Sequence, residues 1–448
     1  MKRIFSITFA FAILAFTTGC DKLLNIEPSQ QISDKVALNS DDNVKSVLIG
    51  AYSEFALPGI YGGNILRNAE LLAGNGELQW VGTYIDPRQI FNKTMIASNS
   101  EVDAQWEDSY AVINTTNNIL SALQVVNEAD RDRVEGEALF LRGLMYFDLV
   151  RFFGQQYEPG AENTQLGVPV VLTPTTGIDK SSFVSRNTVE EDYTQVLADL
   201  KLAVSKLPED NDVYASKGAA NALLARVYLQ KGDFAAARDA ADAVISSGRY
   251  QLMPTYAEEF NNDNNTVEDI FATQITPQDR FSSMTEFFSV LQYGGRDGDI
   301  DILDGHLNLY SPGDTRKDLF FMGNGAWRSG KWNNLYGIVN LFRLAEMYLV
   351  RAECNQRLGT AVGATPVEDF NIVHTRAGLA PVASVTLDNI LLERRLELSF
   401  EGFRIHDVRR LHENVATYAY NDPKLLYPIP EREIQANPAL KDQQNPGY

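Results

Sequence analysis

Two carboxylates near the C-terminus have a spacing that would suit acid catalysis. Glu397 and Glu401 are four residues apart, so a helix would present both on one face, and Asp407 follows nearby. Glycosidases hydrolyse sugar linkages with such a pair. A general acid needs a raised pKa, however, and positive neighbours lower it. The same stretch holds Arg394, Arg395, Arg404, Arg409 and Arg410. We therefore expect that these carboxylates are not catalytic and that the protein is not an enzyme.

The other chemically active side chains lack the patterns of known sites. The histidines show no metal-ligand spacing such as H-x-x-x-H; they are His306, His374, His406 and His412. The sequence has no Gly-x-Ser-x-Gly elbow and no phosphate-binding loop. Cys354 falls among apolar residues in a helical pattern, which is typical of a small buried hydrophobe. The sequence thus predicts neither a metal site nor a cofactor.

The tryptophans point to a different chemistry, the binding of sugars. A neutral sugar offers apolar ring faces flanked by hydroxyl groups, so its site combines exposed aromatic rings with planar hydrogen-bonding groups. Of the 4 tryptophans, Trp106 lies in a helical pattern and is expected in the core. The other three, Trp80, Trp327 and Trp332, lie in polar, irregular stretches. We interpret them as ligand platforms; the alternative is that each plugs a loop against the scaffold.

Helical periodicity governs the chain from about residue 101 onward. Side chains expected to face a core recur at three- and four-residue spacing, first through Trp106, Tyr110, Ile113, Asn117 and Leu120, then through Ala138, Leu141, Met145, Leu149 and Phe152. A polar break at 127–133 predicts two antiparallel helices joined by a short turn. A third helix is expected over 189–207, capped by Thr188 and stopped by Pro208.

One expected helical pair resembles a tetratricopeptide repeat. Its apolar, small, aromatic and turn positions are Leu224, Ala225, Tyr228, Gly232, Asp233, Phe234 and Ala237. A weaker copy spans 344–359, with Ala364 beyond it. Such a repeat cannot bury its apolar face alone, so neighbouring helices must stack on it. The array forms either a concave surface for a partner or plain helical core.

Two long stretches interrupt the helical pattern, at about 58–100 and 253–337. The second is rich in Asn, Asp, Gly and aromatic residues, and its one helical pattern is a short one near 285–290. A loop of that length in an ordered protein is usually functional. We therefore place the ligand site in these stretches, on a helical scaffold over about 101–250 and 338–412.

The N-terminus has the form of an export signal. Two basic residues precede an apolar stretch from residue 4 to 16, which is long enough for a signal peptide and too short to span a bilayer. It ends in Phe-Thr-Thr-Gly-Cys, which resembles a bacterial lipobox. The sequence thus predicts a lipoprotein signal peptide over 1–19 and acylation of Cys20. Ordinary cleavage near Gly19 is the alternative.

Processing would leave an acidic domain on a short tether. A polar segment over 20–40 is expected to lead from the lipid to a single domain over 41–448. The full chain carries a net charge of -20, and loss of the signal peptide leaves 37 basic against 59 acidic residues. This acidity and the lack of a basic run exclude nucleic acid as a partner. Membrane attachment is expected through the lipid anchor only.

The C-terminal third carries a set of motifs in a fixed order. They are Arg-Ala-Gly-Leu at 376–379, Leu-Glu-Arg-Arg-Leu-Glu-Leu-Ser-Phe-Glu-Gly-Phe-Arg-Ile-His-Asp-Val-Arg-Arg at 392–410, Tyr-Pro-Ile-Pro-x-x-Glu at 427–433 and Gln-Asn-Pro-Gly-Tyr at 444–448. Upstream stand Phe-Leu-Arg-x-x-x-Tyr-Phe-Asp-Leu-Val-Arg-Phe-Phe-Gly at 140–154 and Gly-Val-Pro at 167–169. Together with the lipobox, they resemble the SusD/RagB family of Bacteroidetes lipoproteins along the whole chain.

The resemblance implies a mainly all-α, SusD-like fold with tetratricopeptide-like helix pairs. It implies a lipid-anchored protein on the surface of the outer membrane, lying as a lid over a SusC-like TonB-dependent transporter. Such proteins capture nutrient oligomers, commonly glycans, and their charged C-terminal stretch is a structural network. Capture of oligopeptides, which some members perform, and a repeat scaffold without a small ligand are the alternatives.

The resemblance also adds residues to the expected ligand site. In the family, ligand-facing aromatic residues precede the helix that here begins near Arg343, and Tyr293, Arg296 and Trp332 stand in that place. The opposing side of the family's site corresponds to the region of Trp80 and Tyr84. The expected ligand contacts are therefore Trp327, Trp332, Tyr293, Arg296, Trp80 and Tyr84.

Overall fold

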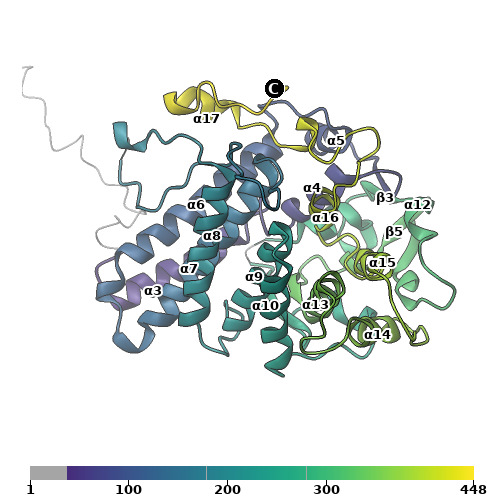
Figure 1. Cartoon of the computed structure of the whole chain (residues 1–448). Helices are drawn as coiled ribbons and strands as arrows, with labels where there is room; N and C mark the ends of the chain where they lie inside the picture. Colours follow the sequence, from purple (N-terminus) through teal and green to yellow (C-terminus); the bar gives the residue numbers. More distant parts are fainter. Residues whose placement is uncertain (1–37, 178, 279) are drawn as a thin grey trace, which may run out of the picture.

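The structure is a computed structural model that describes residues 38–448 except 178 and 279. It is mainly α-helical, as expected, and its longest helices are α3 (Asp41–Phe55), α6 (Ser100–Ser121), α7 (Glu128–Phe153), α8 (Val189–Lys206), α9 (Lys217–Lys231), α10 (Phe234–Ser246) and α13 (Leu344–Leu358). They stand side by side, with α6 and α8 against α7, and α9 and α13 against α10 (Figure 1). The predicted signal peptide, Cys20 and most of the predicted tether lie outside the described residues.

Local signals begin and end these helices where the sequence predicts. At the start of α8, the Thr188 hydroxyl accepts a hydrogen bond from the Glu191 N–H, and the Glu191 carboxylate accepts one from the Thr188 N–H. Gly232 caps α9 with a φ of 74°, which suits a residue without a Cβ. α13 likewise leads through Gly359 to α14 (Pro366–Arg376). Both predicted helix pairs are therefore present.

The stretch 58–100 is more regular than its sequence suggests. It holds α4 (Asn64–Ala73), β1 (Leu78–Trp80) and α5 (Ile85–Asn92) instead of the loop expected there. α4 has an apolar face, but its polar side is buried too, with Arg67, Asn68 and Glu70 inside beside its leucines. The helix has only 10 residues, which is shorter than the stretch over which apolar spacing is a dependable helix signal.

The stretch 253–337 carries most of the short strands. A four-stranded antiparallel sheet has the order β1-β3-β5-β4, with β3 (Ile300–Ile302), β4 (Phe320–Gly323) and β5 (Ala326–Ser329). Separately, β2 (Asp269–Thr273) pairs with β6 (Val339–Arg343), which leads into α13. The short helices are α11 (Ser283–Phe288), which packs on β3, and α12 (Asp304–Leu307). Because β1 pairs with β3, the two interrupting stretches form one layer.

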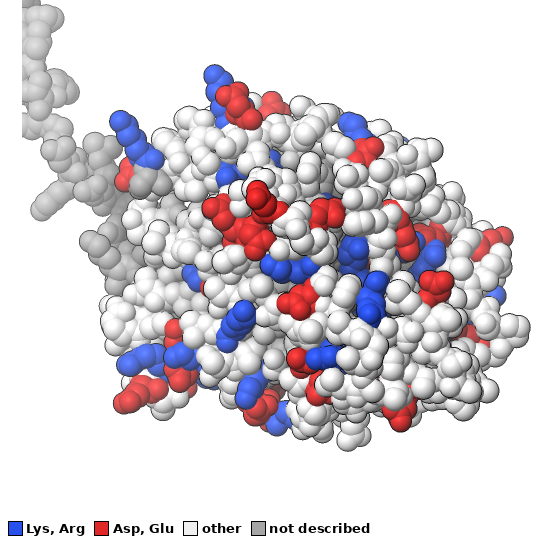
Figure 2. Space-filling view, viewed as in Figure 1, with Lys and Arg blue, Asp and Glu red and all other residues white. Residues whose placement is uncertain are grey.

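The C-terminal segment closes the domain against the helical array. It contains α15 (Leu387–Glu397) on α13, α16 (Arg404–Arg410) on α4, and α17 (Glu431–Ala436). The Asn445 amide donates to the carbonyl oxygens of Phe153 and Tyr427, each at 2.7 Å. On the face shown in Figure 2, the acidic and basic side chains of the described residues are interspersed, and no continuous basic patch is visible.

Two buried carboxyl groups beside β2 make stability depend on pH. Glu259 and Asp269 share the amide of Asn340, whose Nδ2 lies 3.2 Å from Glu259 Oε1 and 2.6 Å from Asp269 Oδ1. Burial first, and then the negative charges of Asp269 and Glu268, raise the pKa of Glu259 well above its usual range. A raised pKa in the folded state stabilises the fold at low pH, and this contribution is lost as the pH rises through that pKa.

We expect Glu259→Gln to weaken this pH dependence. The neutral amide keeps the volume of the side chain, so the variant should be more stable than the parent by about 3 kcal/mol or more at pH 9 and should differ little at pH 4, below the unfolded-state pKa of glutamate. Urea unfolding followed by far-UV circular dichroism at both pH values measures the difference. Glu258→Gln, a change at an exposed neighbour, is the control. Equal pH slopes in the parent and Glu259→Gln would contradict the assignment.

Candidate functional site

Two of the expected ligand residues, Tyr84 and Arg296, meet beside β1. Tyr84 is the N-terminal cap residue of α5, and Arg296 follows the 3-10 turn η5 (Leu291–Tyr293). The guanidinium of Arg296 lies 4.0 Å from the centre of the Tyr84 ring and donates to the Tyr84 hydroxyl at 2.6 Å. Asp299 accepts from Arg296 Nε at 2.9 Å and fixes its orientation. Tyr84 is 45% exposed, so the pair forms a platform with an aromatic face and planar donors.

The platform rests on stacked side chains from three helices. Tyr84 meets the ring of Phe287 in α11 edge to face, with 6.0 Å between ring centres. The guanidinium of Arg67 in α4 lies 4.2 Å from the centre of the same Phe287 ring. Arg67 is fully buried and pairs with Glu101 of α6. These contacts hold the platform in place before any ligand binds.

Tyr293 forms a second exposed aromatic pair. It is 37% exposed, and its ring meets Phe321 of β4 edge to face at 5.6 Å between ring centres. Phe321 lies opposite Arg328 in the pairing of β4 with β5, and Arg328 is held by Asp301 of β3 at 2.8 Å. Arg296 lies three residues beyond Tyr293 in the same loop. The contact of Tyr293 with Phe321 therefore fixes this loop against the β4–β5 hairpin.

Trp327 lies on the other face of the β4–β5 hairpin. It pairs directly with Met322, whereas its neighbour Arg328 pairs with Phe321. Successive side chains of a strand point to opposite faces, so Trp327 and the Tyr293–Phe321 pair are on different sides of the sheet. Trp327 is 40% exposed, and Met322 is more exposed still. The structure therefore separates Trp327 from the residues with which it was expected to act.

Trp80 and Trp332 are core residues, and this corrects their expected role as ligand platforms. Trp80 is 6% exposed and packs against Phe287 with 5.8 Å between ring centres. Trp332 is 3% exposed, and its indole N–H donates to the Phe400 carbonyl oxygen at 3.2 Å. Neither ring offers a face to a ligand. Both close loops against the scaffold, which is the alternative that the sequence left open.

Three residues beside the exposed aromatic side chains are not apparent from the sequence. Phe321 and Met322 come to the surface through the β4–β5 hairpin, and Thr83 accepts from Arg296 at 3.3 Å. The hairpin has a detectable signal, because Asn324 and Gly325 both have positive φ, at 49° and 78°. An Asn-Gly pair between strands is a strong hairpin indicator. Thr83 has no comparable signal.

The carboxylates of the 392–410 stretch are bound in ion pairs. α15 ends at Glu397, so Glu401 lies in the following turn and not on the same helical face as expected. The buried Arg343 nevertheless joins both carboxylates, with Nη1 3.0 Å from Glu397 and Nε 2.9 Å from Glu401. The stretch is a structural charge network, as the family resemblance implies.

Arginines lower the pKa values of two carboxylates in this stretch, Glu397 and Asp407, as the sequence predicts. Burial alone would raise the pKa of Glu397, but Arg376 and its neighbours outweigh burial and bring it to about 2. Against the same effect of burial, Arg394 and Arg410 bring the pKa of Asp407 to about 2. A general acid must keep its proton near neutral pH, so neither carboxylate suits that role.

Cys354 and His306 are buried and lack the properties of active-site groups. Burial, followed by the charge of Arg395, lowers the pKa of His306 to about 3. Cys354 is a free, buried thiol whose pKa is raised by burial. Across residues 38–448 apart from the two gaps, no group of three or more His, Cys, Asp or Glu side chains is placed to hold a metal ion.

Two family models match the chain. The model described as "Starch-binding associating with outer membrane" matches residues 23–229, and the model of the SusD family matches residues 326–424. SusD-like protein P2 of Formosa agariphila is 25% identical over the full length of both chains. A SusD-like protein of Bacteroides ovatus is 24% identical over 94% of this chain and 83% of its own.

Solved structures agree with these matches. A SusD superfamily protein from Bacteroides thetaiotaomicron is 27% identical, with a TM-score of 0.81 over 91% of this chain and 100% of the other. Surface glycan-binding protein A from Bacteroides uniformis has the same fold, at 23% identity and a TM-score of 0.76 over 91% of this chain and 99% of its own. With the motifs, the helix pairs and the buried charge network in place, the chain belongs to the SusD/RagB family.

Proposed function

We propose that this protein captures oligosaccharides at the cell surface and delivers them to a SusC-like TonB-dependent transporter in the outer membrane. The family model over residues 23–229, described as starch-binding and associated with the outer membrane, supports this role. The observation that carries the proposal is the exposed Tyr84–Arg296 platform, which combines an aromatic face with planar donors. Tyr293, in the same loop as Arg296, is a further ligand contact, and Trp327 offers a separate exposed ring for glycan on the other face of the sheet.

The chemistry of this platform suits a neutral sugar. A pyranose ring stacks its apolar face on an aromatic ring while neighbouring polar groups take its hydroxyls. Arg296 and Thr83 supply such groups beside Tyr84. Two or three stacking contacts at about 1 kcal/mol each, with a few hydrogen bonds, give a Kd between about 1 mM and 1 µM. Capture of this strength is reversible, as handing the ligand to a transporter requires.

We propose binding without catalysis because the carboxylates whose spacing suggested a catalytic pair are ionised and held in ion pairs. Glu397 and Asp407 have pKa values of about 2, so neither holds a proton for a leaving group. Arg343 also holds Glu397 and Glu401 together in the core, away from solvent. A sugar linkage has no access to this pair.

Membrane attachment is proposed through a lipid on Cys20. None of the helices that the structure describes is long and apolar enough to cross a membrane. The helical body begins with α3 at Asp41. The chain between Cys20 and Asp41 would reach at most about 70 Å when extended. A tether of that length lets the body lie over a neighbouring transporter.

We expect Tyr84→Ala to weaken glycan retention at little cost in stability. The change removes the aromatic face but leaves Arg296 paired with Asp299. In affinity electrophoresis through gels that contain polysaccharide, apparent affinity should fall at least about fivefold, which corresponds to one stacking contact. The midpoint of thermal unfolding should change by less than about 3 °C.

Tyr420→Ala is the matched control, since it removes a ring that stacks on His412 at 4.1 Å and takes no part in the platform. Its retention should equal that of the parent. Unchanged retention in Tyr84→Ala, or an equal loss in Tyr420→Ala, would count against the platform as the sugar site.

A further inference from the structure

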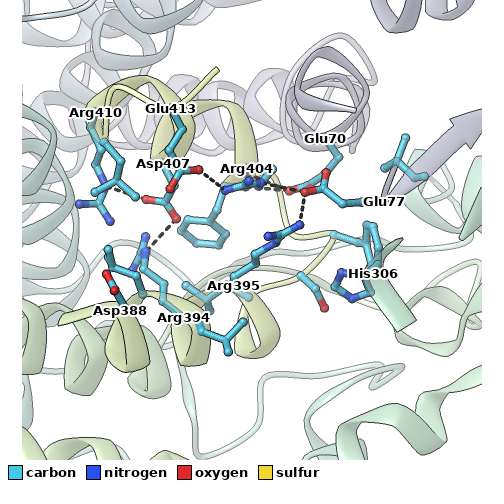
Figure 3. Close-up of a pocket in the computed structure, with 18 residues that line it drawn as sticks. Glu70, Glu77, His306, Asp388, Arg394, Arg395, Arg404, Asp407, Arg410 and Glu413 are labelled. Carbon is cyan, nitrogen blue, oxygen red and sulfur yellow. Dashed lines mark hydrogen bonds and ion pairs between the residues drawn. The ribbon is translucent and has the colours of Figure 1, made fainter. Parts of the chain in front are cut away.

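A separate cavity of about 250 Å³ opens between α15, α16 and β1 (Figure 3). None of the four aromatic and arginine residues of the proposed glycan site lines it; those residues are Tyr84, Tyr293, Arg296 and Trp327. Its walls combine four arginines and five acidic residues with leucine side chains. This mixture differs from the aromatic surface and indicates a ligand of another chemical class.

Two arginines reach into the cavity and converge on one carboxylate. Arg395 of α15 and Arg404 of α16 both point toward the Glu77 carboxylate (Figure 3). Both contact the same oxygen, Glu77 Oε1, Arg395 through Nη2 and Arg404 through Nε at 3.3 Å. Each guanidinium has five N–H donors, so one shared oxygen satisfies few of them. The pair therefore has donors to spare for a ligand.

The remaining acid that contacts this pair is weakly held at the mouth of the cavity. Glu413 is about half exposed, and its Oε2 lies 3.3 Å from Arg404 Nη1. A contact that is both long and exposed contributes little to stability. Arg404 can therefore exchange Glu413 for a ligand oxygen. Arg394 and Arg410, which also line the cavity, each contact a separate oxygen of Asp407, whereas Arg395 and Arg404 share one oxygen of Glu77.

The turn that carries Arg404 is fixed against α4. Gly402 has a φ of 86°, and a Cβ there would lie 2.7 Å from Leu66 Cδ2 and 2.9 Å from Leu66 Cα, so only glycine fits. Glu70 accepts hydrogen bonds from the backbone N–H groups of Gly402, Phe403 and Arg404 at 2.8, 2.9 and 3.3 Å. Arg404 thus projects from a preformed turn.

Another part of the wall is apolar. Leu391 and Leu392 of α15 line the cavity, and Leu392 remains 39% exposed. An exposed leucine beside paired guanidinium groups is suited to the carbon body of a ligand whose acid group lies on the arginines. A bare inorganic anion would leave this leucine wall unused.

We propose that this cavity binds a small organic carboxylate, with the acid group between Arg395 and Arg404 and the carbon body against Leu391 and Leu392. A guanidinium donates two parallel hydrogen bonds to a carboxylate, which makes arginine the side chain best matched to it. The volume lies below the range of about 300–1,000 Å³ for drug-sized ligands, so it suits a single sugar ring or a short chain. A hexuronate and an acylated amino acid share this chemistry.

Isothermal titration of the purified chain with glucuronate, N-acetylleucine, glucose and inorganic phosphate tests the proposal. We expect one of the two organic acids to bind at least about tenfold more tightly than glucose and phosphate. The tighter acid identifies the source, a sugar acid or an amino acid. The proposal is overturned if neither acid binds at about 10 mM, or if glucose or phosphate binds as tightly.

Three variants connect binding to the arginine pair. Arg404→Gln should weaken binding of the preferred acid at least about tenfold, and Glu413→Gln should strengthen it about threefold or more because it removes a competing carboxylate. Arg432→Gln, which alters an exposed arginine paired with Glu107, should leave it unchanged. The Glu413 variant is informative even if Arg404→Gln fails to fold, since Glu413 lies at the rim. Equal affinity in Arg404→Gln and the parent, or no gain in Glu413→Gln, would overturn the site.

Discussion

Replacing Arg343 with methionine is expected to lower the free energy of unfolding by about 3–5 kcal/mol. Arg343 is buried where β6 enters α13, and its guanidinium lies 2.8 Å from Glu268, 3.0 Å from Glu397 and 2.9 Å from Glu401. Methionine keeps much of the volume but leaves three buried carboxylates with one partner fewer. Because domains are typically stable by only about 5–15 kcal/mol, the variant should be close to the limit of folding.

Urea unfolding followed by tryptophan fluorescence measures this effect. Arg432→Met is the matched control, because Arg432 is exposed and contacts Glu107 at 3.2 Å. We expect it to change the free energy of unfolding by less than about 0.5 kcal/mol. A loss below about 1 kcal/mol in Arg343→Met would mean that Arg376 and Lys331 satisfy the buried carboxylates without Arg343.

The two tryptophans of the 327–332 segment should respond oppositely to truncation. Trp332→Ala should cost about 3–5 kcal/mol, because it removes a ring that is 3% exposed and leaves a cavity beside Phe400. Trp327→Ala should cost less than about 1 kcal/mol, because 40% of that residue is already exposed on β5. Trp327→Ala should instead weaken retention on polysaccharide gels.

Paired urea unfolding and affinity electrophoresis of both variants test this contrast. Trp332→Phe is a useful control, since it keeps most of the ring volume and loses the indole hydrogen bond to Phe400. It should cost less than Trp332→Ala. Equal destabilisation by Trp327→Ala and Trp332→Ala would place both rings in the core, and full retention in Trp327→Ala would remove Trp327 from the ligand contacts.

The long helices could be predicted because their signals are local. Thr188 and Gly232 act within a few residues of the helix ends that they set, and the apolar spacing of α6 and α7 repeats along one segment. α7 begins at Glu128 rather than after the polar break expected at 127–133, since acidic residues are favourable in a first helical turn. α4 escaped detection because its 10 residues are fewer than the number over which apolar spacing indicates a helix.

The candidate site depends on pairings that no local pattern records. Tyr84 and Arg296 meet because β1 pairs with β3 across more than 200 residues, and each strand has only three residues. A tryptophan in a polar stretch indicates either function or a buried plug, and the residue type does not distinguish the two. Trp80 and Trp332 are buried, because Trp80 packs against Phe287 and the indole of Trp332 donates to the carbonyl oxygen of Phe400.

In the charged stretch 392–410, the predicted helix was wrong but the predicted electrostatic effect was right. Glu397 and Glu401 do not share a helix, because α15 ends at Glu397. The expected effect of the arginines on the pKa of Glu397 is nevertheless confirmed. Electrostatic effects act through space and depend on the crowding of charges, which the sequence already displays, rather than on the continuity of a helix.

Glycan capture is tested most directly by isothermal titration of the purified chain against a panel of neutral oligosaccharides and oligopeptides. We predict saturable binding of at least one oligosaccharide, with a Kd between about 1 µM and 1 mM. This binding should weaken at least about fivefold in Tyr84→Ala and remain unchanged in Tyr420→Ala. Binding of peptides alone, binding of no ligand in the panel, or oligosaccharide binding that Tyr84→Ala leaves intact would contradict the proposed function.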